Sequence, residues 1–381
     1  MIGHIRQRSK GSWAITIDLP RDEDGKRRQK QKTVRGTKRE AEQILARMLN
    51  EVNSGVYVPE ATLTVGAYLD EWLEIHARHN VAAKTFERYQ ELVTLHIKPA
   101  VGRVRLSQLR PPHIARMYSD LAAPSDTGKR PLAPATIVQI HRILRKALQQ
   151  ALQNQILVRN VADAVRPPRV TRQEMKVLAP AQVRQLIDTA RGTYFWIPIV
   201  LAVTTGMRRG EIVALRWDDV DLAKGALQCQ RSLQVTREGI AFKEPKSGRS
   251  RAIPLPRQAV EALQVHCADQ AEQRKLLGET FNEVGLVCTD IDGSPLHPDR
   301  ISDNFRYLLQ KAGLPAIRFH DLRHTHATLL LQQGVHAKIV SERLGHSTIG
   351  ITLDTYSHVL PSMQEEAARQ IDRILSLTGD R

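Results

Sequence analysis

Residues 320–330 read HDLRHTHATLL, and the stretch combines two patterns that decide how this part of the chain folds. On a helix, His320, Arg323 and His324 stand at positions i, i+3 and i+4, so their side chains share one face. Three leucines of the stretch are predicted to point toward a core: Leu322, Leu329 and Leu330. The stretch therefore predicts a packed helix that presents imidazoles and a guanidinium on one side.

Two kinds of ligand fit that polar face. His320 and His324 have the spacing of a helical zinc pair, but the chain contains no HExxH pattern, and Arg323 would repel a metal cation. A guanidinium instead offers a fork of donors to phosphate oxygens. The face is therefore interpreted as an oxyanion site, and neither a metal nor another cofactor is expected.

A second stretch, TTGMRRGEI at residues 204–212, adds two arginines. Gly206 would permit a tight turn from which Arg208 projects, and Glu211 could fix a nearby arginine. Taken alone, the stretch also fits a helix end that carries solvated arginines. Its meaning depends on what the rest of the chain supplies.

The third stretch, LGHSTIGITLDTYSHVL at residues 344–360, places His346 and Tyr356 ten residues apart across a predicted turn. Structural tyrosines far outnumber nucleophilic ones, so Tyr356 gains significance only beside the other stretches. Phosphoryl transfer needs positive charge at the non-bridging oxygens, a nucleophile, and a proton donor for the leaving oxygen. Together the three stretches supply arginines, histidines and a tyrosine for these tasks.

The charge distribution indicates a polyanionic partner. The net charge is +16, and the first 169 residues account for 13 of these positive charges. A basic front half joined to a nearly neutral back half is typical of a protein that holds nucleic acid. A ribosomal or membrane-surface role is the alternative.

The other compositional signals favour a cytoplasmic protein. The three cysteines form no CxxC pair, which fits a reducing compartment. No segment approaches the ~20 consecutive apolar residues of a membrane span. The start of the chain, MIGHIRQRSKGSW, lacks the apolar run of a signal peptide.

The front half is predicted to hold two modules. Residues 1–58 read as a small ββα-type module, with strands near 11–19 and 29–34 and an amphipathic helix over 37–52. Its basic strands could lie in a DNA groove or form a solvated surface hairpin. Residues 62–165 predict a helical bundle, whose clearest helix covers 135–157 with Pro134 in its first turn.

The back half, residues 175–381, predicts a mixed α+β domain after a Pro-containing boundary at 166–174. Helices are expected over 179–190 and 196–205, and the segment 226–235 reads as one strand. GIAF (239–242) and RAIPL (251–255) flank a basic turn, which predicts a small antiparallel sheet. A tail helix is expected over 361–377. The chain as a whole is thus predicted to be multidomain and mainly α, with small β-sheets.

Four stretches in this order and spacing resemble the catalytic domain of the tyrosine recombinase family, specifically phage or integrative-element integrases. They cover about 175–360 and read TTGMRRGEI, PKSGRSRAIPL (245–255), HDLRHTHAT and LGHSTIGITLDTYSHV. The front half resembles, more loosely, the family's arm-site-binding module and helical core-binding domain. One departure is Asn160-Val161, where relatives often have Asn-Pro.

The resemblance implies roles for the cations. Arg208 and Arg323 match the two arginines that clamp the scissile phosphate. Arg208 is preferred to Arg209 because the family's arginine stands two residues after the glycine. Lys246 matches the hairpin lysine that protonates the leaving 5′-oxygen, with Lys243 as its rival.

The resemblance also implies roles for the remaining polar residues. Tyr356 matches the nucleophile, His320 would assist proton transfer at that nucleophile, and His346 would donate to a phosphate oxygen. Glu211 would support the site by orienting an arginine. His324 is assigned a packing or supporting role.

The reaction implied is site-specific recombination of double-stranded DNA at attachment sites. The tyrosine would form a 3′-phosphotyrosyl bond, and the 5′-hydroxyl of a partner strand would resolve it, so that two rounds pass through a Holliday junction and integrate or excise a phage or mobile element. ATP is not required, and the chain contains no GxxxxGK[ST] loop. A homotetramer on DNA is expected, with an excision helper or a host DNA-bending protein as further partners, and no membrane.

Three other classes share part of this pattern. A catalytically inactive DNA-binding or regulatory protein on the same fold would share the basic front half. A type IB-like topoisomerase would share the tyrosine chemistry but religate the same strand. A zinc hydrolase would use the histidine pair as metal ligands.

Overall fold

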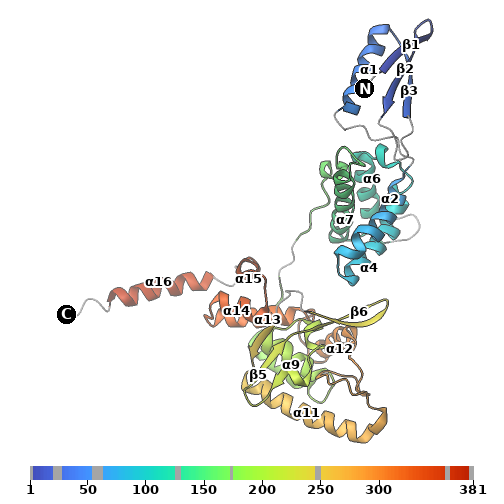
Figure 1. The fold of residues 1–381 in the computed structure, drawn as a ribbon. Helices are drawn as coiled ribbons and strands as arrows, with labels where there is room; N and C mark the ends of the chain where they lie inside the picture. Colours follow the sequence, from blue (N-terminus) through green and yellow to red (C-terminus); the bar gives the residue numbers. More distant parts are fainter. Residues whose placement is uncertain are drawn as a thin grey trace. The chain divides into compact units, whose positions relative to one another are not determined.

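The computed structural model describes residues 3–19, 28–53, 63–124, 130–171, 175–244, 250–356 and 361–376. The chain divides into two compact units, Met1–Thr171 and Arg172–Arg381. The described part is mainly helical with small antiparallel sheets, as the sequence predicts (Figure 1). Among the described helices, none is both long enough and apolar enough to cross a membrane.

The first unit begins with an antiparallel sheet in the order β1-β2-β3, followed by helix α1. The bounds are β1 Gly3–Ser9, β2 Ser12–Leu19, β3 Arg28–Arg35 and α1 Lys38–Asn53. Ile15 and Ile17 of β2 form a small core with Ala41 and Met48 of α1. The sequence predicts two strands here and misses β1, because Ile5 is the only large apolar residue of that strand. Ile5 pairs with Ile15 and completes the apolar face of the sheet.

The rest of the first unit is a helical bundle around one apolar core. Its elements are α2 Val65–Trp72, η1 Leu73–Ala77, α3 Arg78–Asn80, α4 Ala83–Leu92, η2 Val93–Ile97, α5 Lys98–Val101, η3 Leu106–Gln108, α6 Pro111–Ala122, α7 Pro134–Gln153 and η4 Val161–Ala164. Helix α7 begins at Pro134, which confirms the predicted start. It ends at Gln153, before the predicted 157, because the chain turns at Gln155, which has a positive φ of 58°.

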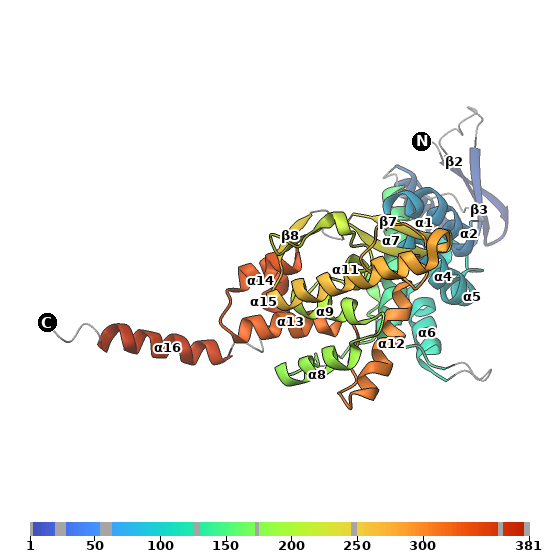
Figure 2. The same ribbon diagram turned by 90° about the horizontal axis from the view of Figure 1, so that it is seen from below.

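The second unit packs its helices around α9. The helical bounds are α8 Pro180–Ala190, α9 Trp196–Thr205, α10 Arg209–Ile212, η5 Trp217–Asp219, α11 Arg257–Leu277, η6 Gly278–Thr280, α12 Pro298–Lys311, α13 Asp321–Gln332, α14 Ala337–Leu344, α15 Ile349–Tyr356 and α16 Pro361–Ser376. The sequence of α9, WIPIVLAVTT, is apolar all round, as a buried helix requires. It contacts α8, α10, α11 and α13 (Figure 2).

The strands of the second unit form two sheets, where the sequence predicts one. One sheet has the order β4-β5-β8 and the other pairs β6 with β7. The bounds are β4 Val220–Asp221, β5 Ala226–Cys229, β6 Ser232–Thr236, β7 Gly239–Lys243 and β8 Arg251–Pro254. The single strand predicted over 226–235 is therefore wrong: it breaks between Cys229 and Ser232. GIAF and RAIPL, in β7 and β8, also belong to different sheets, and the turn at 245–249 lies outside the described residues.

Candidate active site

Helix α13 presents Arg323 toward the C-terminal end of α9. The Arg323 side chain is buried, with 3% of its surface exposed, and its Nη1 donates to the carbonyl oxygen of Gly206 at 2.8 Å. Gly206 caps α9 in the left-handed conformation, with φ of 67°. The carbonyl at a helix C-terminus lies at the negative end of the helix dipole. Arg323 is thus fixed by backbone, and among the described residues its other guanidinium donors make no further hydrogen bond.

Arg208 immediately precedes α10 and is held by Glu211. The backbone N and Nη1 of Arg208 each donate to a Glu211 oxygen at 2.9 Å. Its Nη2 lies 3.4 Å from the carbonyl oxygen of Gly345, and 25% of the side chain is exposed. Arg209 contacts Ser302 and Asp299 instead. Of the two neighbouring arginines, Arg208 therefore contacts Glu211 and Gly345, and Arg209 contacts α12.

Glu211 is a buried carboxylate shared by two arginines. Its side chain is 1% exposed, and Arg251 donates to its two oxygens at 3.2 and 2.6 Å. Burial alone would raise the pKa of Glu211, but the hydrogen bonds from Arg251 and Arg208 outweigh it and lower that pKa to about 2. Arg251 is a residue that the sequence reasoning missed. The RAIPL stretch contains it, but the signal for its role is spatial, not local.

Tyr356 ends α15 and lies against α13. Its ring is 1% exposed, and its hydroxyl is 2.8 Å from Nδ1 of His324. Burial raises the pKa of Tyr356 to about 12, and the charge of Arg323 offsets only part of that effect. The rings of His320 and His324 meet edge to face, with centroids 5.3 Å apart. His324, to which the sequence reasoning gives a packing or supporting role, thus makes a contact with the tyrosine hydroxyl.

His346 is oriented by a threonine of the following helix. Its Nδ1 lies 2.7 Å from Oγ1 of Thr352, which is fully buried. Burial and the nearby Arg323 and Arg208 lower the pKa of His346 to about 4, so the ring is neutral near pH 7. When Nδ1 accepts from the Thr352 hydroxyl, Nε2 carries the hydrogen and becomes a donor. The ring is suited to donate to an oxyanion.

A second network, absent from the sequence reasoning, braces the same region. Arg343 at the end of α14 donates from Nη2 to the carbonyl oxygens of Thr204 and Pro254, at 2.8 and 3.0 Å. Its Nε lies 3.2 Å from Nε2 of His326, whose Nδ1 is 2.7 Å from the carbonyl oxygen of Val203. These bonds require a neutral His326 with hydrogen on Nδ1. They tie α14, β8, α9 and α13 together.

The neutral state of His326 predicts acid sensitivity. Burial lowers its pKa from 6.5 to about 4, so the unfolded chain binds more protons between these values. Stability from this residue is complete above pH 6.5 and is lost as the pH falls toward 4. At pH 5 the loss is about 2 kcal/mol. Urea unfolding of wild type and His326→Gln at pH 7 and pH 5 measures it.

In His326→Gln, the amide retains a donor for Val203, so the drop in unfolding free energy between the two pH values is expected to shrink by about 2 kcal/mol. His79→Gln, which changes an exposed histidine, is the control and is expected to behave as wild type. An unchanged pH dependence in His326→Gln would contradict the assignment.

Of the two candidate lysines, the structure describes only Lys243. Lys246 falls in 245–249 and lies outside the described residues. Lys243 ends β7, where its Nζ donates to Oε1 of Gln234 at 2.6 Å across the β6–β7 pair. Lys243 is therefore engaged on the hairpin itself.

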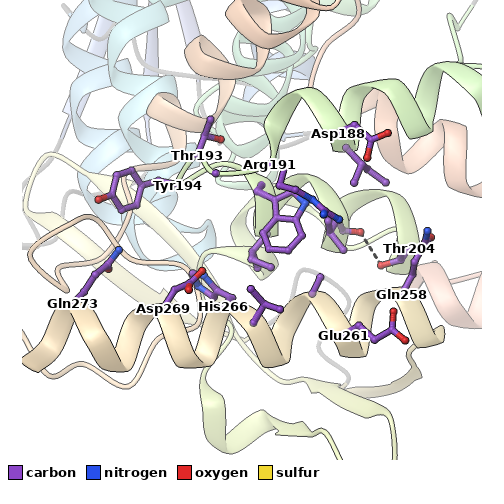
Figure 3. Close-up of a pocket in the computed structure, with 17 residues that line it drawn as sticks. Asp188, Arg191, Thr193, Tyr194, Thr204, Gln258, Glu261, His266, Asp269 and Gln273 are labelled. Carbon is purple, nitrogen blue, oxygen red and sulfur yellow. Dashed lines mark hydrogen bonds between the residues drawn. The ribbon is translucent and has the colours of Figure 1, made fainter.

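A pocket of about 500 Å³ lies between the α8–α9 connection and α11 (Figure 3). Arg191 stacks over the Trp196 ring at 5.5 Å, and His266 and Asp269 come from α11. Within the described chain, the pocket lining includes none of the predicted site residues. In the same described ranges, no group of three or more His, Cys, Asp or Glu side chains is placed to hold a metal ion.

Family models match three successive parts of the chain. The phage integrase family matches residues 176–363, the SAM-like N-terminal domain of phage integrases matches 64–122, and an arm DNA-binding domain matches 5–52. The first match contains all of the predicted site residues. The three matches together span most of the chain in the order that the resemblance implies.

Individual relatives agree over nearly the full length. A tyrosine recombinase XerC-like protein of Caldanaerobacter subterraneus subsp. tengcongensis is 28% identical and covers 94% of this chain and 95% of its own. The ICEBs1 integrase of Bacillus subtilis (strain 168) is 24% identical, over 97% of this chain and all of its own.

Solved structures share the fold. A Tn1549 transposon integrase bound to circular intermediate DNA has a TM-score of 0.67 at 22% identity, over 81% of this chain and 99% of its own. A lambda integrase tetramer bound to a Holliday junction has a TM-score of 0.57 at 20% identity, over 90% of this chain and 95% of its own. The arginine, histidine and tyrosine cluster and the three successive domain matches lead to one conclusion: the chain belongs to the phage integrase family of tyrosine recombinases.

Proposed function

We propose that this protein is a site-specific DNA recombinase that cleaves and rejoins DNA through a 3′-phosphotyrosyl intermediate and so integrates or excises a phage or mobile element. The observation that carries the proposal is the Tyr356 hydroxyl, 2.8 Å from a neutral imidazole on the helix that also bears Arg323. A buried tyrosine beside a base and a guanidinium is equipped to attack a phosphate.

In the cleavage step, the Tyr356 oxygen attacks the scissile phosphorus and its proton passes to Nδ1 of His324. The bond between phosphorus and the 5′-oxygen breaks, and the leaving 5′-oxygen takes a proton from Lys246. Arg208 and Arg323 neutralise charge on the non-bridging oxygens, and His346 donates to one of them. His320 lies edge-on to His324 and supports its orientation.

In the rejoining step, the 5′-hydroxyl of a partner strand attacks the phosphotyrosyl phosphorus and releases Tyr356. One phosphodiester replaces another, so no nucleotide hydrolysis is required. The arginines and imidazoles supply the charge stabilisation that metal ions supply in other phosphoryl-transfer enzymes.

The test is covalent trapping. The full chain is incubated with a nicked suicide duplex that spans the attachment-site core of the element encoding it, with and without EDTA, and run on a denaturing gel. An adduct of equal yield in both arms supports the proposal, and mass mapping should place the DNA on Tyr356. Binding without an adduct would favour the inactive DNA-binding alternative, and an adduct lost in EDTA would contradict the metal-free chemistry.

The contact between His324 and Tyr356 predicts a distinctive pH profile. His324→Asn keeps a polar atom near the Nδ1 position but removes the base, so single-turnover cleavage should fall about 10²-fold at pH 7.5. The variant then depends on spontaneous tyrosinate, and because the pKa of Tyr356 is about 12, its rate should rise about tenfold per pH unit from 7 to 9. Wild type should be flat there, because burial lowers the pKa of His324 and keeps the ring neutral.

His320→Asn is the matched control for this profile. It changes the neighbouring imidazole in the same way and is expected to keep the flat profile. If His320→Asn acquires the slope and His324→Asn does not, the proton acceptor is His320.

The two front modules are proposed to bind DNA. Residues 1–58 would bind arm sites through the sheet face opposite α1, which the strand register assigns to His4, Arg6, Thr16, Gln31 and Thr33. Residues 62–165 would bind the core site, and 175–381 would carry out catalysis. These roles follow from the basic charge of the first 169 residues.

Assembly and location complete the proposal. A homotetramer on two attachment sites would bring four active sites to two duplexes. Helix α16 would pack either on a neighbouring protomer or on its own chain. An excision helper or a host DNA-bending protein would set direction. The protein would act in the cytoplasm on nucleoid DNA.

A further inference from the structure

Arg251, the first residue of β8, is the most enclosed cation that contacts Glu211. Its side chain is 9% exposed, compared with 25% for Arg208. Both terminal nitrogens of Arg251 donate to Glu211, and its Nε donates to the carbonyl oxygen of Arg343 at 3.0 Å. All three guanidinium nitrogens are therefore committed to protein acceptors. Because only 9% of its side chain is exposed, Arg251 is less open to a phosphate than Arg208 and is placed to hold these protein acceptors.

The shared carboxylate explains why such a residue is present. Glu211 alone with Arg208 would form an isolated ion pair, in which the carboxylate cancels the positive charge that a phosphate requires. A second guanidinium on the same carboxylate leaves the group of three with a net positive charge. It also fixes both Glu211 oxygens, one of which accepts from the backbone N of Arg208 and the other from Nη1. Arg208 is thereby held in one orientation.

Arg251 also fixes the second contact of Arg208. The turn after α14 passes directly over the Arg251 side chain, and a Cβ at Gly345 would lie only 3.0 Å from Nη1 of Arg251. Gly345 adopts φ of 68°, and its carbonyl oxygen faces Nη2 of Arg208. The next residue is His346. One buried guanidinium therefore supports both partners of Arg208 and the start of the segment that carries His346.

We propose that Arg251 is a positioning residue for the cleavage reaction: it holds Glu211 and the Gly345 turn so that Arg208 keeps its charge and its aim at the scissile phosphate. This inference rests on the proposed recombinase function. It assigns Arg251 no contact with DNA. Its loss should therefore reduce the rate of chemistry and leave DNA affinity nearly unchanged.

The experiment compares Arg251→Gln and Arg251→Lys with wild type in the full chain. Single-turnover cleavage of the nicked suicide duplex is measured at saturating protein, and Kd for the same duplex is measured by fluorescence anisotropy. Arg251→Gln is expected to cleave roughly 30- to 100-fold more slowly, as a misplacement of about 1 Å would produce. Its Kd should stay within about threefold, because binding energy comes mainly from other phosphate contacts. Arg251→Lys keeps the charge and should recover at least about threefold of the loss.

Two further variants distinguish positioning from general destabilisation. If Arg251 acts through Glu211, Arg251→Gln should cost less than about threefold in a Glu211→Gln background, because coupled residues are not additive. Arg231→Gln breaks another arginine–carboxylate pair of the same unit, in which Arg231 lies 2.6 Å from the buried Asp219, and should lower Tm without a comparable loss of cleavage.

Three results would overturn the positioning role. The losses of cleavage could multiply in the double variant, or the loss in Arg251→Gln could be accompanied by a parallel rise in Kd. The loss could also match that of Arg231→Gln at equal Tm. Failure of wild type to form any adduct would instead refute the recombinase function. The two failures are therefore distinguishable in one set of gels.

Discussion

Tyr356→Phe is expected to form no detectable covalent adduct with the suicide duplex, a loss of more than about 10³-fold, while DNA affinity stays within about twofold. The substitution removes one oxygen and leaves the ring among Ala327, Leu331 and Leu344. It breaks a single hydrogen bond, to His324, so stability should change by only about 1 kcal/mol. The gel and a thermal melt measure the two effects separately.

Tyr307→Phe provides the matched control, because it removes the same atom from a tyrosine that is 60% exposed on α12. This variant should form the adduct like wild type. An adduct that persists in Tyr356→Phe at wild-type yield would place the nucleophile on another residue. A melt that collapses in Tyr356→Phe would instead indicate that the hydroxyl is structural.

Because Tyr356 is buried, the rest of the site must help to remove the proton of its hydroxyl. With a pKa of about 12, the tyrosinate is a very minor species near pH 7. A neutral imidazole at hydrogen-bond distance removes the need for prior ionisation, because the proton leaves as the phosphorus bond forms. Arg323 also favours negative charge on the Tyr356 oxygen, because its positive charge acts to lower the pKa of the hydroxyl.

Much of this site could be predicted because its members lie in short, regular stretches. The i, i+3, i+4 spacing of His320, Arg323 and His324 survives in α13, which begins at Asp321. The turn expected at Gly206 is the left-handed cap of α9. Hydrophobic periodicity located α7 because that helix is 20 residues long, whereas α9 was located by its nearly continuous apolar run.

The features that the sequence did not predict correctly also have physical causes. Leu227, Cys229 and Leu233 fall on the same face of one continuous strand, and the interruption at Arg231 between them was not taken as the break that separates β5 from β6. Arg251 and Arg343 act through partners about 40 to 140 residues away in sequence, and no local pattern marks such contacts. The choice between two histidines one helical turn apart also depends on where α15 packs, which the spacing does not encode.

The two arginines proposed to clamp the phosphate are held by the same structural feature. Arg323 donates to the carbonyl oxygen of Gly206, and Arg208 approaches that of Gly345. Both glycines end helices in the left-handed conformation, at φ of 67° and 68°. The carbonyls at such ends are partly negative and cannot be moved without unwinding the helix. Backbone carbonyls therefore help to orient both cations without adding a full negative charge of their own, while Glu211 supplies the carboxylate that pairs with Arg208.

Gly206→Ala is expected to damage both the fold and the reaction. A Cβ there would lie 2.6 Å from Cδ2 of Leu344 and 2.7 Å from Cδ2 of His326, closer than side chains tolerate. Left-handed strain of about 1 kcal/mol and overpacking of about 2 kcal/mol should lower the unfolding free energy by about 3 kcal/mol. A shift of the Gly206 carbonyl by about 1 Å would also move Arg323 and slow cleavage about 10²-fold.

Gly334→Ala is the control that separates the backbone strain of a left-handed alanine from the steric clash of its Cβ. Gly334 follows α13 with φ of 77°, and a Cβ there meets nothing within 4 Å. This control should lose only about 1 kcal/mol, measured by urea unfolding, and cleave within about threefold of wild type. If Gly206→Ala behaves like Gly334→Ala in both assays, the carbonyl is not a rigid support for Arg323. A large loss of cleavage at Gly206 with adequate folding at the assay temperature would show that the end of α9 sets the aim of the phosphate clamp.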